Sequence, residues 1–505
     1  MGRTEKSIKN IIFGIGAQII TTVLTFVSRT IMLNSLGLEV ISLNGLFKEV
    51  IEALSLAELG IGSAIVYNLY KPLAEQNEEK VCQLMTFFKQ AYRVIAITIF
   101  LLGTVICIFV PYIVKDIDFS YGYIRIVFIL FVANISGSYL FSYKISLLNA
   151  DQKSYIYSFY SSIIKVVTVV VEVGIMLATK NYIFYLISCI LLTLLTNYII
   201  SIKIDARYPY LREAKLPTEE KRHIFDNVKN IFIKELSGKI TNSTDNILIS
   251  TIISTIMVGK YTFYSTILNV FKQFTSHVDT GIRASMGNLF VDGTKEECEN
   301  VLYRLTWGYC TLGVICGVCF FSCCQSFITF WVGEEYLLGM PVVFILAINL
   351  FSFMCSKPIY AAMHVAGLFK EGRNISIIGS VVNLVVSVIF AYCTGIFGVF
   401  FGTFFTYIIQ IVMKIYYVYK LKFGCSGKRY YLYMLNYIIL FALLVLINTY
   451  LCGLVNTSVH ILDFIIQGVI SAGVSGLSIL LCYWRSEEIK YYKRLVFSYL
   501  KKLKK

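Results

Sequence analysis

The sequence predicts an all-α, polytopic membrane protein, and composition, apolar windows and charge placement all support this. Of 505 residues, 57% are hydrophobic and 15% are charged, and the mean hydropathy is +0.72. Soluble domains are about 45–50% apolar and about 25% charged. A soluble protein is therefore excluded, and the bilayer provides the environment for most side chains.

Apolar windows long enough to cross about 30 Å of hydrocarbon need about 17–25 residues each, and they predict about 14 transmembrane helices. The predicted spans are residues 11–33, 43–67, 94–112, 124–147, 158–178, 183–202, 231–253, 261–282, 305–330, 340–365, 375–394, 399–419, 433–452 and 461–484. The second, seventh and eighth carry several charges, which lowers their hydropathy.

The distribution of basic residues predicts the orientation. If the N-terminus is cytoplasmic, the outward loops hold only Lys115, Lys180 and Lys260, and an even number of spans keeps the basic segments 203–229 and 485–505 together inside. Cytoplasmic loops of membrane proteins are enriched in Lys and Arg. The net charge of +15 therefore reflects the orientation of the chain in its membrane, with both termini cytoplasmic, and no nucleic-acid partner is expected.

Three segments recur in the same order at an offset near 220, which predicts an internal repeat. IKNI at 8–11 returns as VKNI at 228–231, ELGIGSA at 58–64 as DTGIRAS at 279–285, and SIIKVVTVV at 162–170 as SVVNLVVSV at 380–388. Halves with six helices each are parallel repeats.

The repeat predicts two six-helix bundles around a central cavity, followed by two further helices. The expected domains are an N-terminal bundle at 1–202, a cytoplasmic linker at 203–230, a C-terminal bundle at 231–421, helices 13 and 14 at 422–484, and a basic cytoplasmic tail at 485–505.

Charged residues inside predicted spans are the candidate site residues, because each costs roughly 2.5–3.5 kcal/mol on insertion scales. Arg29, Lys165, Lys234 and Lys272 are the cationic candidates, and Glu58, Asp245 and Asp279 are possible ion-coupling residues. Spacing along a helix allows neutralising pairs at Lys165/Glu172, Lys48/Glu52, Glu235/Lys239 and Asp279/Arg283. Lys48, Arg283 and Lys357 also fit a purely structural role. Gly238, Asn242 and Asp245 predict a polar stripe along the seventh span.

No motif indicates an enzyme, a metal site or a cofactor. Cys316 and Cys319 form a CxxC without a second pair, which is too little for a zinc or redox centre. The DxD at Asp116–Asp118 falls in a predicted outer loop, and neither a Walker A nor an HExxH motif is present.

Several stretches carry a family resemblance, chiefly over residues 1–95 and 225–290. SIKNIIFG, FVSRT, SLGLEVISLNGLF, KQAYR and TNSTDNILIS resemble polysaccharide-unit flippases, the O-antigen-type translocases of the MOP/MATE-like exporter superfamily. The resemblance implies two bundles that alternate access and move an undecaprenyl-pyrophosphate-linked oligosaccharide to the outer leaflet. It also implies that cavity cations bind the pyrophosphate, Arg29 first, then Lys165, Lys234 and Lys272.

The resemblance implies membrane lipids, a polysaccharide polymerase and glycosyltransferases as partners. A MATE-type multidrug or cation antiporter is the main alternative, although span 11–33 contains no acidic residue, whereas drug-exporting relatives place their cation site there. A membrane polymerase or glycosyltransferase needs a larger extramembrane segment, and a scaffold without cargo does not need charges in its spans.

Overall fold

The computed structural model describes residues 3–55, 61–151, 153–222, 224, 244–455, 457 and 459–494. Every regular element within these ranges is a helix, which confirms the predicted all-α class. The chain divides into two compact units, Met1–Thr262 and Phe263–Lys505.

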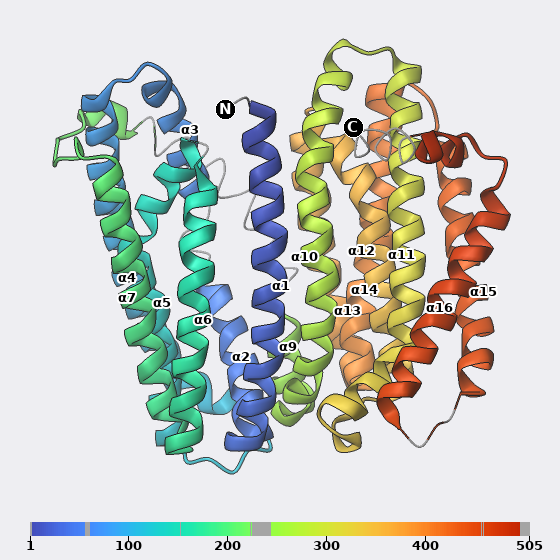
Figure 1. Ribbon diagram of the computed structural model, residues 1–505, viewed down its shortest axis with the longest axis horizontal. Helices are drawn as coiled ribbons and strands as arrows, with labels where there is room; N and C mark the ends of the chain where they lie inside the picture. Colours follow the sequence, from blue (N-terminus) through green and yellow to red (C-terminus); the bar gives the residue numbers. More distant parts are fainter. Residues whose placement is uncertain are drawn as a thin grey trace. The chain divides into compact units, whose positions relative to one another are not determined.

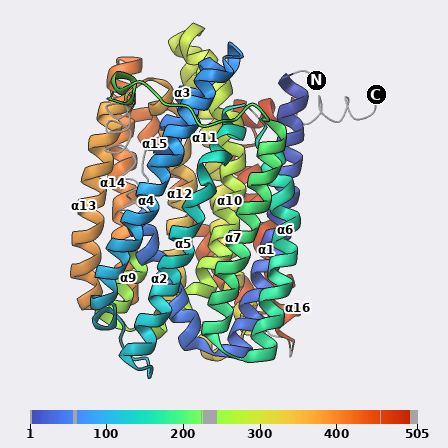
Figure 2. The same ribbon diagram turned by 90° about the vertical axis from the view of Figure 1, so that its left-hand side faces the viewer.

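Unit 1 is built around a row of long helices. Its elements are α1 (Arg3–Leu36), α2 (Leu38–Leu54), α3 (Ile61–Ala74), α4 (Glu78–Ile113), α5 (Tyr121–Ala150), α6 (Ser154–Thr179), α7 (Tyr182–Arg207), the short α9 (Asp245–Leu248) and the π-helical η2 (Ile249–Ile253). In the order α4, α5, α7, α6, α1, each helix packs on the next, and Figure 2 shows this row across the unit. Consecutive long helices run in opposite directions (Figure 1).

Unit 2 repeats part of this pattern. It contains most of α10 (Thr255–Asp292), then α11 (Lys295–Trp331), the 3₁₀ turn η3 (Glu334–Tyr336), α12 (Met340–Val365), α13 (Phe369–Thr394), α14 (Ile396–Val418), the π-helical η4 (Tyr419–Phe423), α15 (Lys428–Gly453) and α16 (His460–Tyr483). The order α11, α12, α14, α13 matches α4, α5, α7, α6 in its packing, while α15 and α16 pack on α11. An internal repeat predicts that corresponding helices of the two units pack in the same order.

The corresponding helices α4 and α11 also begin in the same way. The Asn77 side chain accepts a hydrogen bond from the backbone N–H of Lys80, and Thr294 forms a reciprocal capping box with Glu297 at the start of α11. Each cap satisfies backbone donors that the first turn of a helix leaves unpaired. Both helices then continue for more than 30 residues, 36 in α4 and 37 in α11.

Within the described residues, 11 helices are long and apolar enough to cross a membrane. They match the predicted spans except 43–67, 231–253 and 261–282, the three with several charges. Residues 56–60 and 231–243 lie outside the described part of the chain, and α10 covers 261–282 as a helix but is not apolar enough. The count of about 14 is therefore not confirmed.

The α13–α14 hairpin depends on close backbone contact at Gly398. Gly395 makes the turn with a φ of +65°, and a Cβ at Gly398 would meet the backbone carbonyl of Phe390. We expect Gly398→Ala to lower the free energy of unfolding by about 1–3 kcal/mol, as overpacking does. Thermal unfolding of the purified protein measures this.

Gly174→Ala in α6 is the matched control, because a Cβ there meets nothing within 4 Å. The control should be neutral or slightly stabilising, since alanine favours a helix interior by up to about 1 kcal/mol over glycine. Equal effects of the two substitutions would contradict the packing explanation.

Candidate functional site

Arg29 lies in α1 with its side chain half-buried, close enough to Tyr182 and Tyr185 of α7 to interact with both electrostatically. The two tyrosines are three residues apart, so they share one helix face, and their rings stack with centroids 5.8 Å apart. Within the part of the chain that the structure describes, no carboxylate forms an ion pair with Arg29. Arg29 is therefore a candidate for contact with an anionic ligand.

Further polar contacts extend this group across α2, α6 and α7. The Asn44 amide of α2 donates to the Tyr182 hydroxyl at 3.2 Å. On the other side, the Cys189 thiol of α7 donates to Glu172 Oε1 of α6 at 3.5 Å. We name Arg29, Asn44, Glu172, Tyr182, Tyr185 and Cys189 the tyrosine cluster.

The predicted pairing of Lys165 with Glu172 is not present as an ion pair in the described residues. Glu172 is buried, whereas Lys165 is exposed, although the two still interact electrostatically. The reason is geometric: residues seven apart are separated by two turns, about 10.5 Å along the axis. Lys48 and Glu52 of α2 are both exposed and likewise form no ion pair.

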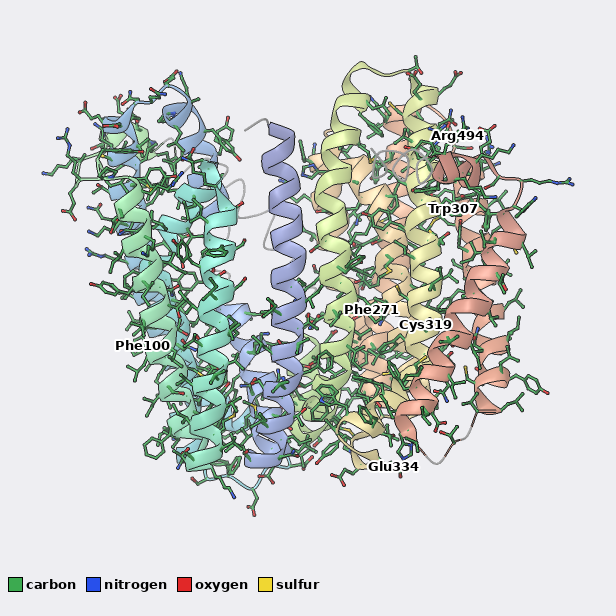
Figure 3. All side chains as sticks on the ribbon, in the orientation of Figure 1. Phe100, Phe271, Trp307, Cys319, Glu334 and Arg494 are labelled. Atoms are coloured by element: carbon green, nitrogen blue, oxygen red, sulfur yellow. The ribbon has the colours of Figure 1, made fainter. Side chains whose placement is uncertain are left out.

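In unit 2, Lys272 of α10, Lys357 of α12 and Lys414 of α14 form a lysine cluster. The ammonium groups of Lys272 and Lys357 lie 5.8 Å and 4.3 Å from the centroid of the same ring, Phe353. Figure 3 marks Phe271, the residue before Lys272 on α10. Phe353 and Lys357 are four residues apart on α12 and so share a face.

Lys414 is the most buried member of the lysine cluster, at 4% exposed. Its ammonium lies 4.9 Å from the Tyr360 ring centroid, donates to Gln410 Oε1 at 3.1 Å, and interacts electrostatically with Lys357. No described carboxylate forms an ion pair with Lys414. Burying a charge without an opposite charge is costly, so an anionic ligand would stabilise this arrangement.

Of the three predicted ion-coupling residues, only Asp245 has a side chain within the described part of the structure. Asp245 begins α9 and interacts electrostatically with Glu49 of α2, whose Oε2 accepts a hydrogen bond from the Asn246 backbone N–H at 2.9 Å. Glu58, and Lys234 of the cationic set, lie outside the described residues, and so does the side chain of Asp279 on α10. Gly238 and Asn242 of the predicted polar stripe lie outside them too.

Sequence reasoning missed Lys414 and the two tyrosines. A lysine within the apolar run 399–419 was a sufficient signal for Lys414, whereas nothing in the sequence distinguishes Tyr182 and Tyr185 from the other tyrosines. The structure brings Lys272 together with Lys357 and Lys414 in unit 2. In unit 1, Arg29 interacts with Tyr182 and Tyr185 at one end of the tyrosine cluster. Lys165 interacts with Glu172 at the other end.

All 14 cysteines are free thiols, including Cys316 and Cys319; Figure 3 labels Cys319 on α11. Among the described residues, no three or more His, Cys, Asp or Glu side chains are grouped to hold a metal ion. Asp116 and Asp118 lie in the connection between α4 and α5.

The fold is similar to solved transporter structures over most of the chain. Lipid II flippase MurJ in its inward-closed conformation matches with a TM-score of 0.67 and 15% identity, over 94% of this chain and all of MurJ. An inward-facing multidrug MATE transporter of the MOP superfamily matches with a TM-score of 0.60 and 13% identity, over 82% of this chain and 99% of the other.

A MOP-superfamily transporter from Pyrococcus furiosus matches with a TM-score of 0.55 and 13% identity, over 83% of this chain and 96% of the other. No protein-family model and no curated protein sequence matches this chain. The chain therefore has the fold that lipid II flippase MurJ shares with the MATE transporters of the MOP superfamily.

Proposed function

We propose that this protein is a flippase that moves an undecaprenyl-pyrophosphate-linked oligosaccharide from the cytoplasmic to the outer leaflet by alternating access, for export of cell-surface polysaccharide. The lysine cluster is the observation that carries the proposal. Lys272 and Lys357 lie on the same Phe353 ring, and Lys357 interacts electrostatically with the buried Lys414. An anionic headgroup would be attracted to positive charges gathered in this way. The fold supports the proposal because MurJ is a lipid II flippase.

The proposed cationic groups are of two kinds. Arg29 offers a planar fork of donors that matches phosphate oxygens, whereas the lysines are mobile point charges. We propose that Arg29, Lys165, Lys234 and Lys272 contact the pyrophosphate. We add Lys357, which shares the Phe353 ring with Lys272, and Lys414, which interacts with Lys357. The polyprenyl tail remains in lipid throughout.

The proposed orientation places both termini in the cytoplasm of a bacterial cell, with bundles at 1–202 and 231–421 joined by the linker 203–230. An inside-negative potential then assists export, because about two negative charges moving outward gain roughly 4–5 kcal/mol per 100 mV. Glu58, Asp245 and Asp279 are the proposed coupling residues, with Glu49 beside Asp245. We propose a polysaccharide polymerase and glycosyltransferases as functional partners.

Reconstituted translocation tests the proposal. The purified protein is placed in proteoliposomes with a fluorescent undecaprenyl-pyrophosphate oligosaccharide, and its arrival in the opposite leaflet is followed by quenching. We expect translocation that depends on the protein and on the pyrophosphate, with an undecaprenol lacking the phosphates left behind. Equal movement of both lipids would contradict recognition of the headgroup.

A MATE-type multidrug or cation antiporter is the second candidate, because MATE transporters share the fold. Export of cationic dyes from proteoliposomes under an imposed proton or sodium gradient separates the two functions. The cationic clusters predict that such dyes are not transported. Dye export without lipid translocation would favour the antiporter.

A further inference from the structure

A cavity of about 250 Å³ lies in unit 1, where α4, α5 and α7 meet the segment that follows α7. The polar residues that line it are Thr86, Lys89, Tyr143, Lys144, Asp205, Arg212 and Glu213. This volume is below the roughly 300–1,000 Å³ of pockets for drug-sized ligands. It suits a small headgroup.

Two ion pairs neutralise the carboxylates of this cavity. Lys89 Nζ lies 2.7 Å from Glu213 Oε1, and Lys144 Nζ lies 2.6 Å from Asp205 Oδ2. The Lys89 ammonium also holds the pKa of Glu213 below its ordinary value, so this carboxylate is ionised at neutral pH. Neither carboxylate needs a cationic ligand.

Two arginines leave the cavity with a surplus of positive charge. Arg212 lines the cavity, and Arg93 of α4 is close enough to Glu213 and Tyr143 to interact with both. Both arginines are exposed, and neither forms an ion pair with a described carboxylate. Guanidinium groups bind phosphate oxygens in pairs of parallel hydrogen bonds.

Backbone contacts hold the segment that carries Arg212 against α4. The Ala214 N–H donates to Thr86 Oγ1 at 3.0 Å, and the Cys82 thiol donates to the Tyr210 carbonyl at 3.2 Å. Arg212 therefore sits on a fixed segment beside the cavity, which lowers the cost of ordering it around a ligand.

A lipid fits the cavity better than free phosphate does, because an exposed apolar surface begins next to Arg93. Along α4 the exposed residues Val94, Ile97, Leu101, Val105 and Ile108 recur three or four apart and so form one stripe. Figure 3 labels Phe100, which belongs to the same exposed stretch. Acyl chains can lie along this stripe while a phosphate reaches the arginines.

We propose that this cavity binds the phosphodiester headgroup of an anionic phospholipid. Arg212 and Arg93 contact the phosphate, the two ion pairs shape the cavity, and α4 receives the acyl chains. Basic pockets between helices at the membrane surface bind anionic headgroups in this way. The site is separate from the tyrosine and lysine clusters, so it does not depend on the proposed transport function.

The test compares lipid binding by native mass spectrometry of the full-length protein in detergent. Phosphatidylglycerol, phosphatidylethanolamine and phosphatidylcholine are each titrated, and inorganic phosphate is added as a competitor. We expect phosphatidylglycerol to bind at least fivefold more tightly than the other two lipids. The double variant Arg93→Gln/Arg212→Gln should lose this preference, and inorganic phosphate should not displace the lipid at millimolar concentration.

Arg207→Gln is the matched control, because Arg207 is exposed in the last turn of α7 and does not line the cavity. It should leave the preference for phosphatidylglycerol unchanged. If the control and the double variant lose the preference for phosphatidylglycerol equally, the preference arises from the general positive charge of the surface, and the proposed site is overturned. Equal binding of all three lipids, or displacement by inorganic phosphate, would overturn it as well.

Discussion

Replacing Lys414 with methionine is expected to reduce translocation of the pyrophosphate-linked oligosaccharide about tenfold or more, while thermal stability stays unchanged or rises. A hydrogen bond to a charged group contributes about 1.5–3 kcal/mol, and each 1.4 kcal/mol is tenfold. Stability should not fall, because methionine fills a similar volume without a buried charge, and Lys414 is 4% exposed and has no described carboxylate partner.

The translocation assay and a thermal unfolding curve on the same preparation measure both effects. Lys420→Met is the control: Lys420 lies in η4, is exposed, and donates to the Tyr416 hydroxyl at 2.8 Å. It should behave like the unsubstituted protein. If Lys414→Met transports normally, the lysine cluster is not part of the headgroup site. If transport and stability fall together, the role of Lys414 is structural.

Arg29→Ala is expected to lower translocation about 10- to 100-fold without abolishing folding. The substitution removes the half-buried guanidinium beside Tyr182 and Tyr185, and with it the one arginine of the proposed pyrophosphate site. Arg29→Lys should recover part of the rate, because it restores the charge but not the planar fork.

Arg125→Ala controls for the loss of an arginine near a helix terminus. Arg125 lies in the first turns of α5, is exposed, and donates to the Ile108 carbonyl at 3.5 Å. Its substitution should leave transport intact. Unimpaired transport by Arg29→Ala would remove Arg29 from the proposed site. Full recovery by Arg29→Lys would instead show that charge alone is needed.

Hydropathy was sufficient where a helix is predominantly apolar. The span predicted at 340–365 coincides with α12 (Met340–Val365), because a mostly apolar segment of this length has no other stable conformation in lipid. Charged residues lowered the hydropathy of the predicted spans 43–67 and 261–282. In place of the first span the structure has α2 and α3, one on each side of residues 56–60, and the second span lies within the long helix α10.

Helix spacing alone was a poor guide to which charges meet. Lys165 and Glu172 share a helix face, yet Glu172 receives a hydrogen bond from Cys189 of α7 while Lys165 is exposed. The partner of a buried group depends on which neighbouring helix supplies a donor. That choice follows from packing between helices, which one helix cannot specify.

The sequence alone determines that the protein is an all-α membrane chain with charges inside its spans, and three recurring segments predict a repeat. Local hydropathy and residue identity decide these properties. Only the tertiary structure decided that Lys272, Lys357 and Lys414, on three different helices, form one cluster around Phe353 and Tyr360. Their separation in sequence carries no distance information, because the packing of α12 with α14 brings two of these helices together.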